Sequence, residues 1–210
     1  MGFSGWPAEA VAFFTGLQAD NTKAYWTANK ARYEASVRGP MAELLGELDG
    51  EFGPARIARP YRDMRFAAGR APYKTEIYAI FDRGGYVNFS AAGLRAALGY
   101  FMMSAAQLDR YRHAVDAETE GAALAGVLDR LRAEGLQAGG TQALKVAPRG
   151  YPGDHPRIVL LRYKGLICWQ HWPVAPWLHT AQAKNRVADF FRTAAPLRHW
   201  LDRNVGADPG

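Results

Sequence analysis

The stretch RIARPYRDMRFAAGRAPYKTEIYAIFD, residues 56–82, decides the expected fold because the spacing of its apolar residues changes. Earlier in the chain apolar residues recur at helical spacing, whereas from residue 59 onward they alternate with polar ones. In an extended segment 74–82, one face carries Thr75, Ile77, Ala79 and Phe81. Lys74, Glu76 and Tyr78 then share the opposite face, which is typical of a half-buried strand.

A second segment, 59–66, alternates in the same way, so we expect the two to form an antiparallel hairpin. A register that places Arg65 opposite Glu76 brings opposite charges together and keeps the character of both faces. A register shifted by two residues sets Arg65 against Lys74 instead. We therefore predict the first register.

The chain is predicted to adopt an α+β fold around an antiparallel sheet. Segments 86–90 and 95–103 are two more expected strands, entered through turns at 84–85 and 92–93, which completes a meander of about four strands. LICWQHW, residues 166–172, predicts a strand in the C-terminal part.

Three helices are expected before the meander. The first begins after Pro7, the second is capped by Asn21, and the third is opened by Pro40 after a break at Gly39.

Further helices are expected in the middle and at the C-terminus. A capping box of Ser104 and Gln107 opens one, and Gly135 closes the next. Residues 136–153 are predicted to be a loop with a short strand at best. Further predicted elements are a short helix at 157–163 after an Asp154 cap, a helix from Thr180 to Arg192 and a last helix from Pro196. A hairpin between 157–163 and the following strand is the alternative to the short helix.

The composition is that of a single globular domain over residues 1–210. Hydrophobic residues make up 49% and charged residues 22%, which supports a buried core and argues against disorder. Cys168 is the only cysteine, so neither an internal disulfide nor a cysteine zinc cluster can form. No signal peptide or membrane-length apolar run is recognised, so we expect a cytoplasmic protein without a membrane partner, and its oligomeric state stays open.

Positive charge is concentrated in residues 56–76. Six cations against two carboxylates leave +4 there, out of +6 for the whole chain. The cations are Arg56, Arg59, Arg62, Arg65, Arg70 and Lys74. Guanidinium forks and loop amides bind phosphate and carboxylate groups, so a small anionic ligand is the favoured partner. The candidate ligand-binding residues are Arg62, Arg65, Arg70, Tyr73 and Lys74.

Two alternatives to this anion site remain open. In the first, Asp63 and Glu76 neutralise Arg65 and its neighbours in a structural network. In the second, the stretch binds nucleic acid, with Tyr61 and Tyr73 available for stacking. The second is less favoured, because a nucleic-acid-binding protein more typically spreads its cations along an exposed face with aromatic residues available for stacking.

Other kinds of site find little support, and no catalytic residue, metal or cofactor is predicted. The five histidines show no metal-ligand spacing. On a strand, Cys168 and His171 face opposite ways, and a cysteine in so apolar a segment is expected to be core. Asp154 before His155 fits a helix cap better than an acid–base pair, and Trp169, Trp172 and Trp177 are expected to pack.

Several segments together resemble a widespread, mostly bacterial family of conserved hypothetical proteins, a domain of unknown function. The segment with the clearest resemblance is RDMRFAAGRAPYKT, residues 62–75. The others are Phe3-Ser4, Asn21-Thr22-Lys23 before Tyr25-Trp26, Asn29-Lys30 before Tyr33, Ala97-Leu98-Gly99-Tyr100, LDRYRHAV, PRGYPGDHP and PLRHWL. The resemblance covers nearly the whole chain and implies an α+β protein, but supplies no reaction, substrate or cofactor.

The chain departs from that family's pattern inside the basic stretch. Where the family usually has Ser after the Phe and an Asp-Lys pair before the Pro-Tyr-Lys, this chain has Ala67, Gly69 and Arg70. The cation is kept, but a hydroxyl and a carboxylate are absent. A family function that used either group is therefore in doubt for this chain.

Overall fold

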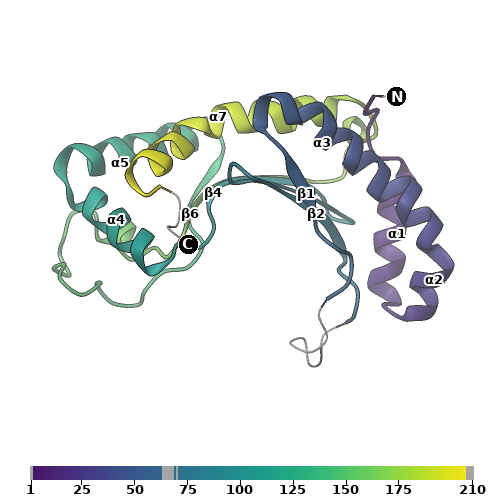
Figure 1. The fold of residues 1–210 in the computed structure, drawn as a ribbon, viewed down its shortest axis with the longest axis horizontal. Helices are drawn as coiled ribbons and strands as arrows, with labels where there is room; N and C mark the ends of the chain where they lie inside the picture. Colours follow the sequence, from purple (N-terminus) through teal and green to yellow (C-terminus); the bar gives the residue numbers. More distant parts are fainter. Residues whose placement is uncertain (1, 63–68, 70, 207–210) are drawn as a thin grey trace. The chain divides into compact units, whose positions relative to one another are not determined.

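The computed structural model describes residues 2–62, 69 and 71–206. Within it the chain divides into two compact units, Met1–Ala96 with His171–Phe190, and Ala97–Gln170 with Phe191–Gly210. Three elements run from one unit into the other: β4 (Gly93–Tyr100), β6 (Leu166–Trp172) and α7 (Gln182–Asn204) (Figure 1). The expected single domain over 1–210 stays a prediction.

The described strands form one six-stranded sheet in the order β1-β2-β3-β4-β6-β5. The remaining strands are β1 (Ala55–Ile57), β2 (Glu76–Phe81), β3 (Gly85–Ser90) and β5 (Gln137–Gly140). β1 pairs with β2, β2 with β3 and β5 with β6, all antiparallel. The α+β class is confirmed, as is a meander of four strands joined by C-terminal strands.

The predicted register of the first hairpin is wrong at the described residues. Ile80 of β2 lies opposite Arg56 of β1, and Tyr61 lies opposite Tyr73 in an isolated bridge. The predicted register would have placed Tyr61 opposite Ile80. The regular first strand also lies earlier than the predicted strand 59–66. It ends at Ile57, before Pro60, which has no N–H to donate to a neighbouring strand, and of the described residues 59–62 only Tyr61 forms a bridge. Arg65, one member of the predicted Arg65–Glu76 pair, lies outside the described residues.

Helical elements of the first unit pack against its part of the sheet. They are α1 (Ala8–Ala19), α2 (Lys23–Arg32), the π-helical turn η1 (Tyr33–Arg38), α3 (Gly39–Phe52) and the 3₁₀ turn η3 (Pro176–His179). The predicted break at Gly39 is wrong, because the chain stays helical through η1 into α3. Pro40 sits in the first turn of α3, where its missing N–H is tolerated. Asn21 is not the cap of α2 either, since Thr22 accepts the hydrogen bond from the Tyr25 amide.

The core of the first unit lies between these helices and one face of the sheet. Ile77, Ala79 and Phe89 alternate onto that face and are buried. The indole of Trp6 stacks on Phe89 with ring centroids 4.7 Å apart and an interplanar angle of 5°. The opposite face of β2 and β3 carries half-buried polar side chains, and these form much of the candidate site.

Most predicted elements of the second unit are confirmed. Its helices are α4 (Ala105–Asp116), α5 (Glu118–Ala133) and α6 (Ile158–Leu161). The Ser104–Gln107 capping box forms, and the short helix within 157–163 is present in place of the alternative hairpin. Asp154 does not cap this helix, whose N-cap is Arg157. The two predicted C-terminal helices are in fact one, α7, with Pro196 inside it.

The core of the second unit forms around Tyr111 and Trp200, whose rings meet edge to face at 6.1 Å. Both polar atoms are satisfied, because Tyr111 donates to the Leu160 carbonyl and Trp200 to the Glu120 carbonyl. Across the described part of the chain, no helix is both long and apolar enough to cross a membrane.

Candidate functional site

The basic stretch enters and leaves the sheet beside the N-terminal end of β2. Of its predicted ligand-binding residues, Arg62, Tyr73 and Lys74 are described, and Arg65 and Arg70 lie outside the described residues. Arg56, farther back, forms an exposed ion pair with Asp82 at 3.3 Å.

Tyr73 is fixed by two residues from the start of α2. Asn21 accepts a hydrogen bond from the Tyr73 amide at 3.0 Å and donates one to the Tyr73 carbonyl at 3.1 Å. The Tyr73 ring stacks on Trp26, with centroids 4.6 Å apart and an interplanar angle of 7°. A side-chain amide thus pairs with the backbone as a neighbouring strand would, which explains why Asn21 is not used as a helix cap.

Arg62 closes the base of the loop. One terminal nitrogen of its guanidinium donates to the Tyr73 carbonyl at 2.7 Å and to the Ala71 carbonyl at 3.0 Å. The Arg62 amide donates to the Pro72 carbonyl at 2.8 Å. These acceptors are neutral, so the guanidinium is positioned without losing its net charge to a carboxylate.

Lys74, the residue after Tyr73, is also held by neutral oxygen atoms. Its ammonium donates to the Arg59 carbonyl at 2.8 Å and to the Tyr78 hydroxyl at 3.2 Å, and lies 4.7 Å from the centre of the Tyr78 ring. The ring face attracts the cation as well. Because the Tyr78 oxygen accepts this bond, its own proton is available for another acceptor.

A polar cluster continues along the same face of the sheet. Asn88, almost fully buried, donates both to the Glu76 carboxylate and to the Tyr86 hydroxyl. Burial, and next the Glu76 charge, raise the pKa of Tyr86 to about 12, so this phenol stays protonated at neutral pH. Glu76 and Lys74 are two positions apart on one strand face, yet each is bound to a different neutral partner.

Comparisons with known proteins identify the family but no activity. A family model described as conserved hypothetical protein (DUF2461) matches residues 9–200. The chain belongs to the DUF2461 family. No curated protein matches it. Among solved structures, a conserved hypothetical protein from Pyrococcus furiosus matches at 16% identity and a TM-score of 0.40, covering 77% of this chain and 92% of that one.

The DUF2461 match spans every residue of the candidate site, so the resemblance to a family of conserved hypothetical proteins is confirmed. That the Arg-Asp-x-Arg-Phe…Pro-Tyr-Lys core marks the family, and that the family is mostly bacterial, stay predictions.

Sequence reasoning missed the groups that position this site. Asn21 and Trp26 are about fifty residues away from Tyr73, so no local pattern links them. One of these groups could have been found from the sequence. Alternation placed Lys74 and Tyr78 on the same face, four residues apart, which predicts that the two side chains are neighbours.

His155 is the strongest alternative candidate for a functional residue in this DUF2461 chain, but both of its ring nitrogens already have partners within the protein. Its Nε2 lies 3.1 Å from an Asp116 carboxylate oxygen, and its Nδ1 accepts the Arg157 amide at 3.0 Å. With both ring nitrogens bound, the imidazole has no free position for proton transfer.

Cys168 is core, as expected: it is fully buried, and burial raises its pKa to about 12. Trp172 packs edge to face against Trp177. Among the described residues, no group of three His, Cys, Asp or Glu side chains could hold a metal, and the absence of a required metal stays a prediction.

Proposed function

We propose that this protein binds a small anionic ligand, carrying a phosphate or carboxylate group, at the base of its basic loop. Lys74 and Arg62 supply the positive charge, and the Tyr78 hydroxyl supplies a further donor. Arg65 and Arg70 belong to the proposal on the sequence alone.

One observation carries the proposal: two cations are fixed in position by neutral oxygen atoms. Arg62 is bound to the Ala71 and Tyr73 carbonyls, and Lys74 to the Arg59 carbonyl and the Tyr78 hydroxyl. Within residues 2–62, 69 and 71–206, neither cation forms an ion pair. In a purely structural network we would expect carboxylate partners for such cations, as Arg56 has in Asp82.

Fixing a cation in advance favours binding, because the side chain has already lost its conformational freedom. Both Arg62 and Lys74 are only partly exposed, which limits screening of their charge by solvent. Guanidinium and ammonium groups bind phosphate through charge-assisted hydrogen bonds. The two side chains therefore support recognition of an oxyanion.

The proposal is tested by calorimetric titration of the full chain with inorganic phosphate and with acetate at constant ionic strength. Lys74→Gln removes the charge, and we expect it to weaken binding about tenfold or more, as for loss of a charge-assisted hydrogen bond. Lys74→Arg keeps the charge and should recover part of the affinity. Lys145→Gln, an exposed lysine of the second unit, makes the same change in net charge away from the site.

The site assignment fails if Lys74→Gln binds either anion as tightly as the parent while circular dichroism shows it folded. It also fails if Lys145→Gln loses as much affinity, because the effect is then one of net charge.

A second candidate function, binding of single-stranded nucleic acid, is favoured by one observation. Tyr61 is 51% exposed, and the Arg59 guanidinium lies 5.6 Å from its ring centre. An exposed ring beside a cation is suited to stack on a base. Fluorescence anisotropy with a labelled oligonucleotide separates the two functions, since Tyr61→Ala should weaken oligonucleotide binding and leave phosphate binding unchanged.

A further inference from the structure

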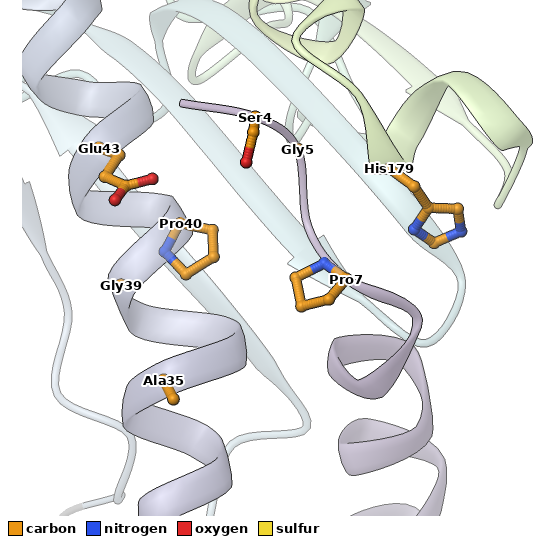
Figure 2. Close-up of a pocket in the computed structure, with 8 residues that line it drawn as sticks. All are labelled: Ser4, Gly5, Pro7, Ala35, Gly39, Pro40, Glu43 and His179. Atoms are coloured by element: carbon orange, nitrogen blue, oxygen red, sulfur yellow. The ribbon is translucent and has the colours of Figure 1, made fainter. Parts of the chain in front are cut away.

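A pocket of about 320 Å³ lies in the first unit, apart from the basic loop. Its lining residues are Ser4, Gly5, Pro7, Ala35, Gly39, Pro40, Glu43 and His179. Figure 2 shows Glu43 and Pro40 on one side and the N-terminal segment with Ser4 and Pro7 on the other. The Glu43 carboxylate is directed toward the Ser4 side of the gap. This volume suits part of a small organic molecule.

The N-terminal wall of this pocket is held firmly. The Trp6 amide donates to the Leu178 carbonyl at 3.1 Å, and the Phe3 amide donates to Glu47 at 2.5 Å. Gly5 has φ +100°, and a Cβ there would lie 2.3 Å from the His179 carbonyl carbon. Only glycine fits this position, so the N-terminal segment can pack directly against the backbone at His179.

The polar groups in the pocket are able to accept hydrogen bonds. His179 has its Nδ1 2.6 Å from the Trp6 carbonyl, which requires the proton on Nδ1 and leaves Nε2 as an acceptor in the neutral ring. The π-helical turn brings the Gly39 amide to the Glu34 carbonyl, five residues back. In the same pattern the Ala35 carbonyl would receive a bond from residue 40, but Pro40 has no N–H. Turns of this kind frequently occur at functional sites.

Glu43 is the one charged residue in the lining. One turn further along α3, Glu47 accepts from Phe3 and pairs with Lys184 at 2.6 Å, which holds the pKa of Glu47 below its ordinary value. Glu43 has no such ion pair among the residues that the structure describes. In a chain of net charge +6, an unpaired carboxylate beside a formed pocket indicates a cationic ligand.

From these contacts we propose that the pocket binds a small organic cation, an amine or guanidinium attached to an apolar body. The charged group bonds to the Glu43 carboxylate and to the Ser4 hydroxyl oxygen, and the apolar body packs between Pro7 and Pro40. Such a site is separate from the anion site and does not depend on it.

Benzylamine and benzyl alcohol test this proposal, since they differ mainly in the charged group. Each is titrated into the ¹⁵N-labelled full chain at neutral pH, and the amide signals of Gly5 and Gly39 report on the pocket. We expect the amine to bind about fivefold more tightly than the alcohol, in keeping with a partly exposed charge pair. Glu43→Gln should remove this preference, whereas Asp49→Asn, on the same helix but outside the lining, should keep it.

The proposal is overturned by equal binding of the two probes to the parent, by a preference that survives in Glu43→Gln, or by shifts confined to residues away from the pocket. Glu43 is exposed, so its substitution is not expected to prevent folding.

Discussion

At the scale of single residues, the candidate site depends on side chains that bind backbone. Asn21 forms hydrogen bonds with both the amide and the carbonyl of Tyr73. Arg62 and Lys74 donate three more hydrogen bonds to backbone carbonyls around the base of the loop, one of them again to the Tyr73 carbonyl. These bonds position the cations. The two Asn21 hydrogen bonds, together with the stack of Trp26 on Tyr73, also connect the start of α2 to the segment that leads into β2.

Asn21→Ala should therefore destabilise the fold by about 1–3 kcal/mol, since it leaves the part-buried Tyr73 amide without a partner, while the Tyr73 carbonyl keeps its hydrogen bond from Arg62. Urea unfolding followed by circular dichroism measures the change. Asn29→Ala removes only one hydrogen bond, to the Tyr25 carbonyl one turn back, and should be nearly neutral. Equal losses in the two variants would contradict the proposed role of Asn21.

The sequence predicted the cations of this site but not what positions them. Lys74 and Tyr73 stand in a charged, alternating segment whose composition is visible directly. Asn21 has two competing uses, a helix cap and a partner for a distant backbone, and local pattern favours the nearer one. Thr22 is an equally good cap, which leaves Asn21 available for the longer-range contact.

At the scale of elements, prolines and glycines were the hardest residues to interpret. Gly39 is expected to break the chain between two helices, and Pro40 and Pro196 are each expected to open a new one. The chain instead stays helical into α3, and Pro196 lies inside α7. Pro40 lies in a first turn, where no N–H is required, after a π-helical turn that widens the helix. The spacing of apolar residues along the sequence carries no information about such a turn. Strand β2, whose apolar face is buried, was predictable because alternation reports burial directly. Alternation was misleading at 59–62, where the described residues contribute only an isolated bridge at Tyr61.

Substituting alanine for each of two helical glycines compares the gain in helix propensity with the cost of steric crowding. Gly46, on α3, has open space around an added Cβ, so Gly46→Ala should stabilise the fold by about 0.5–1 kcal/mol. Gly16, on α1, would place a Cβ 2.2 Å from the Tyr25 hydroxyl oxygen. That hydroxyl donates to the Phe13 carbonyl at 3.0 Å, so Gly16→Ala should cost about 1 kcal/mol or more.

Thermal unfolding of both variants measures these shifts. If Gly16→Ala gained as much stability as Gly46→Ala, the close packing of α2 on α1 would be refuted.

At the scale of the whole molecule, acidic groups that are kept protonated occur in both units. Burial raises the pKa of Tyr33 and Tyr86 in the first unit, and of Tyr100 and Cys168 in the second, each to about 12. In the unfolded chain these groups lose their protons near pH 9 to 10. Their stabilising effect is therefore complete below pH 9 and is lost as pH rises toward 12.

We expect the free energy of unfolding to fall between pH 9 and 11, by up to about 1.4 kcal/mol per pH unit for Cys168, which is fully buried. Urea titrations at successive pH values measure the slope. Cys168→Ala removes one such group and should give a shallower slope, even though the smaller side chain lowers stability at every pH. An unchanged slope would contradict the assignment of a protonated thiol to the core.

The central claim is that Lys74 and Arg62 are charged, fixed in advance and available to an anion. The most direct measurement is a crystal structure of the full chain grown with selenate, whose anomalous signal locates the anion. We predict a selenate oxygen about 2.7–2.9 Å from the Lys74 ammonium, with the Tyr78 hydroxyl or Arg62 as a second donor. Ordered selenate elsewhere on the protein, with none at Lys74, would contradict the claim.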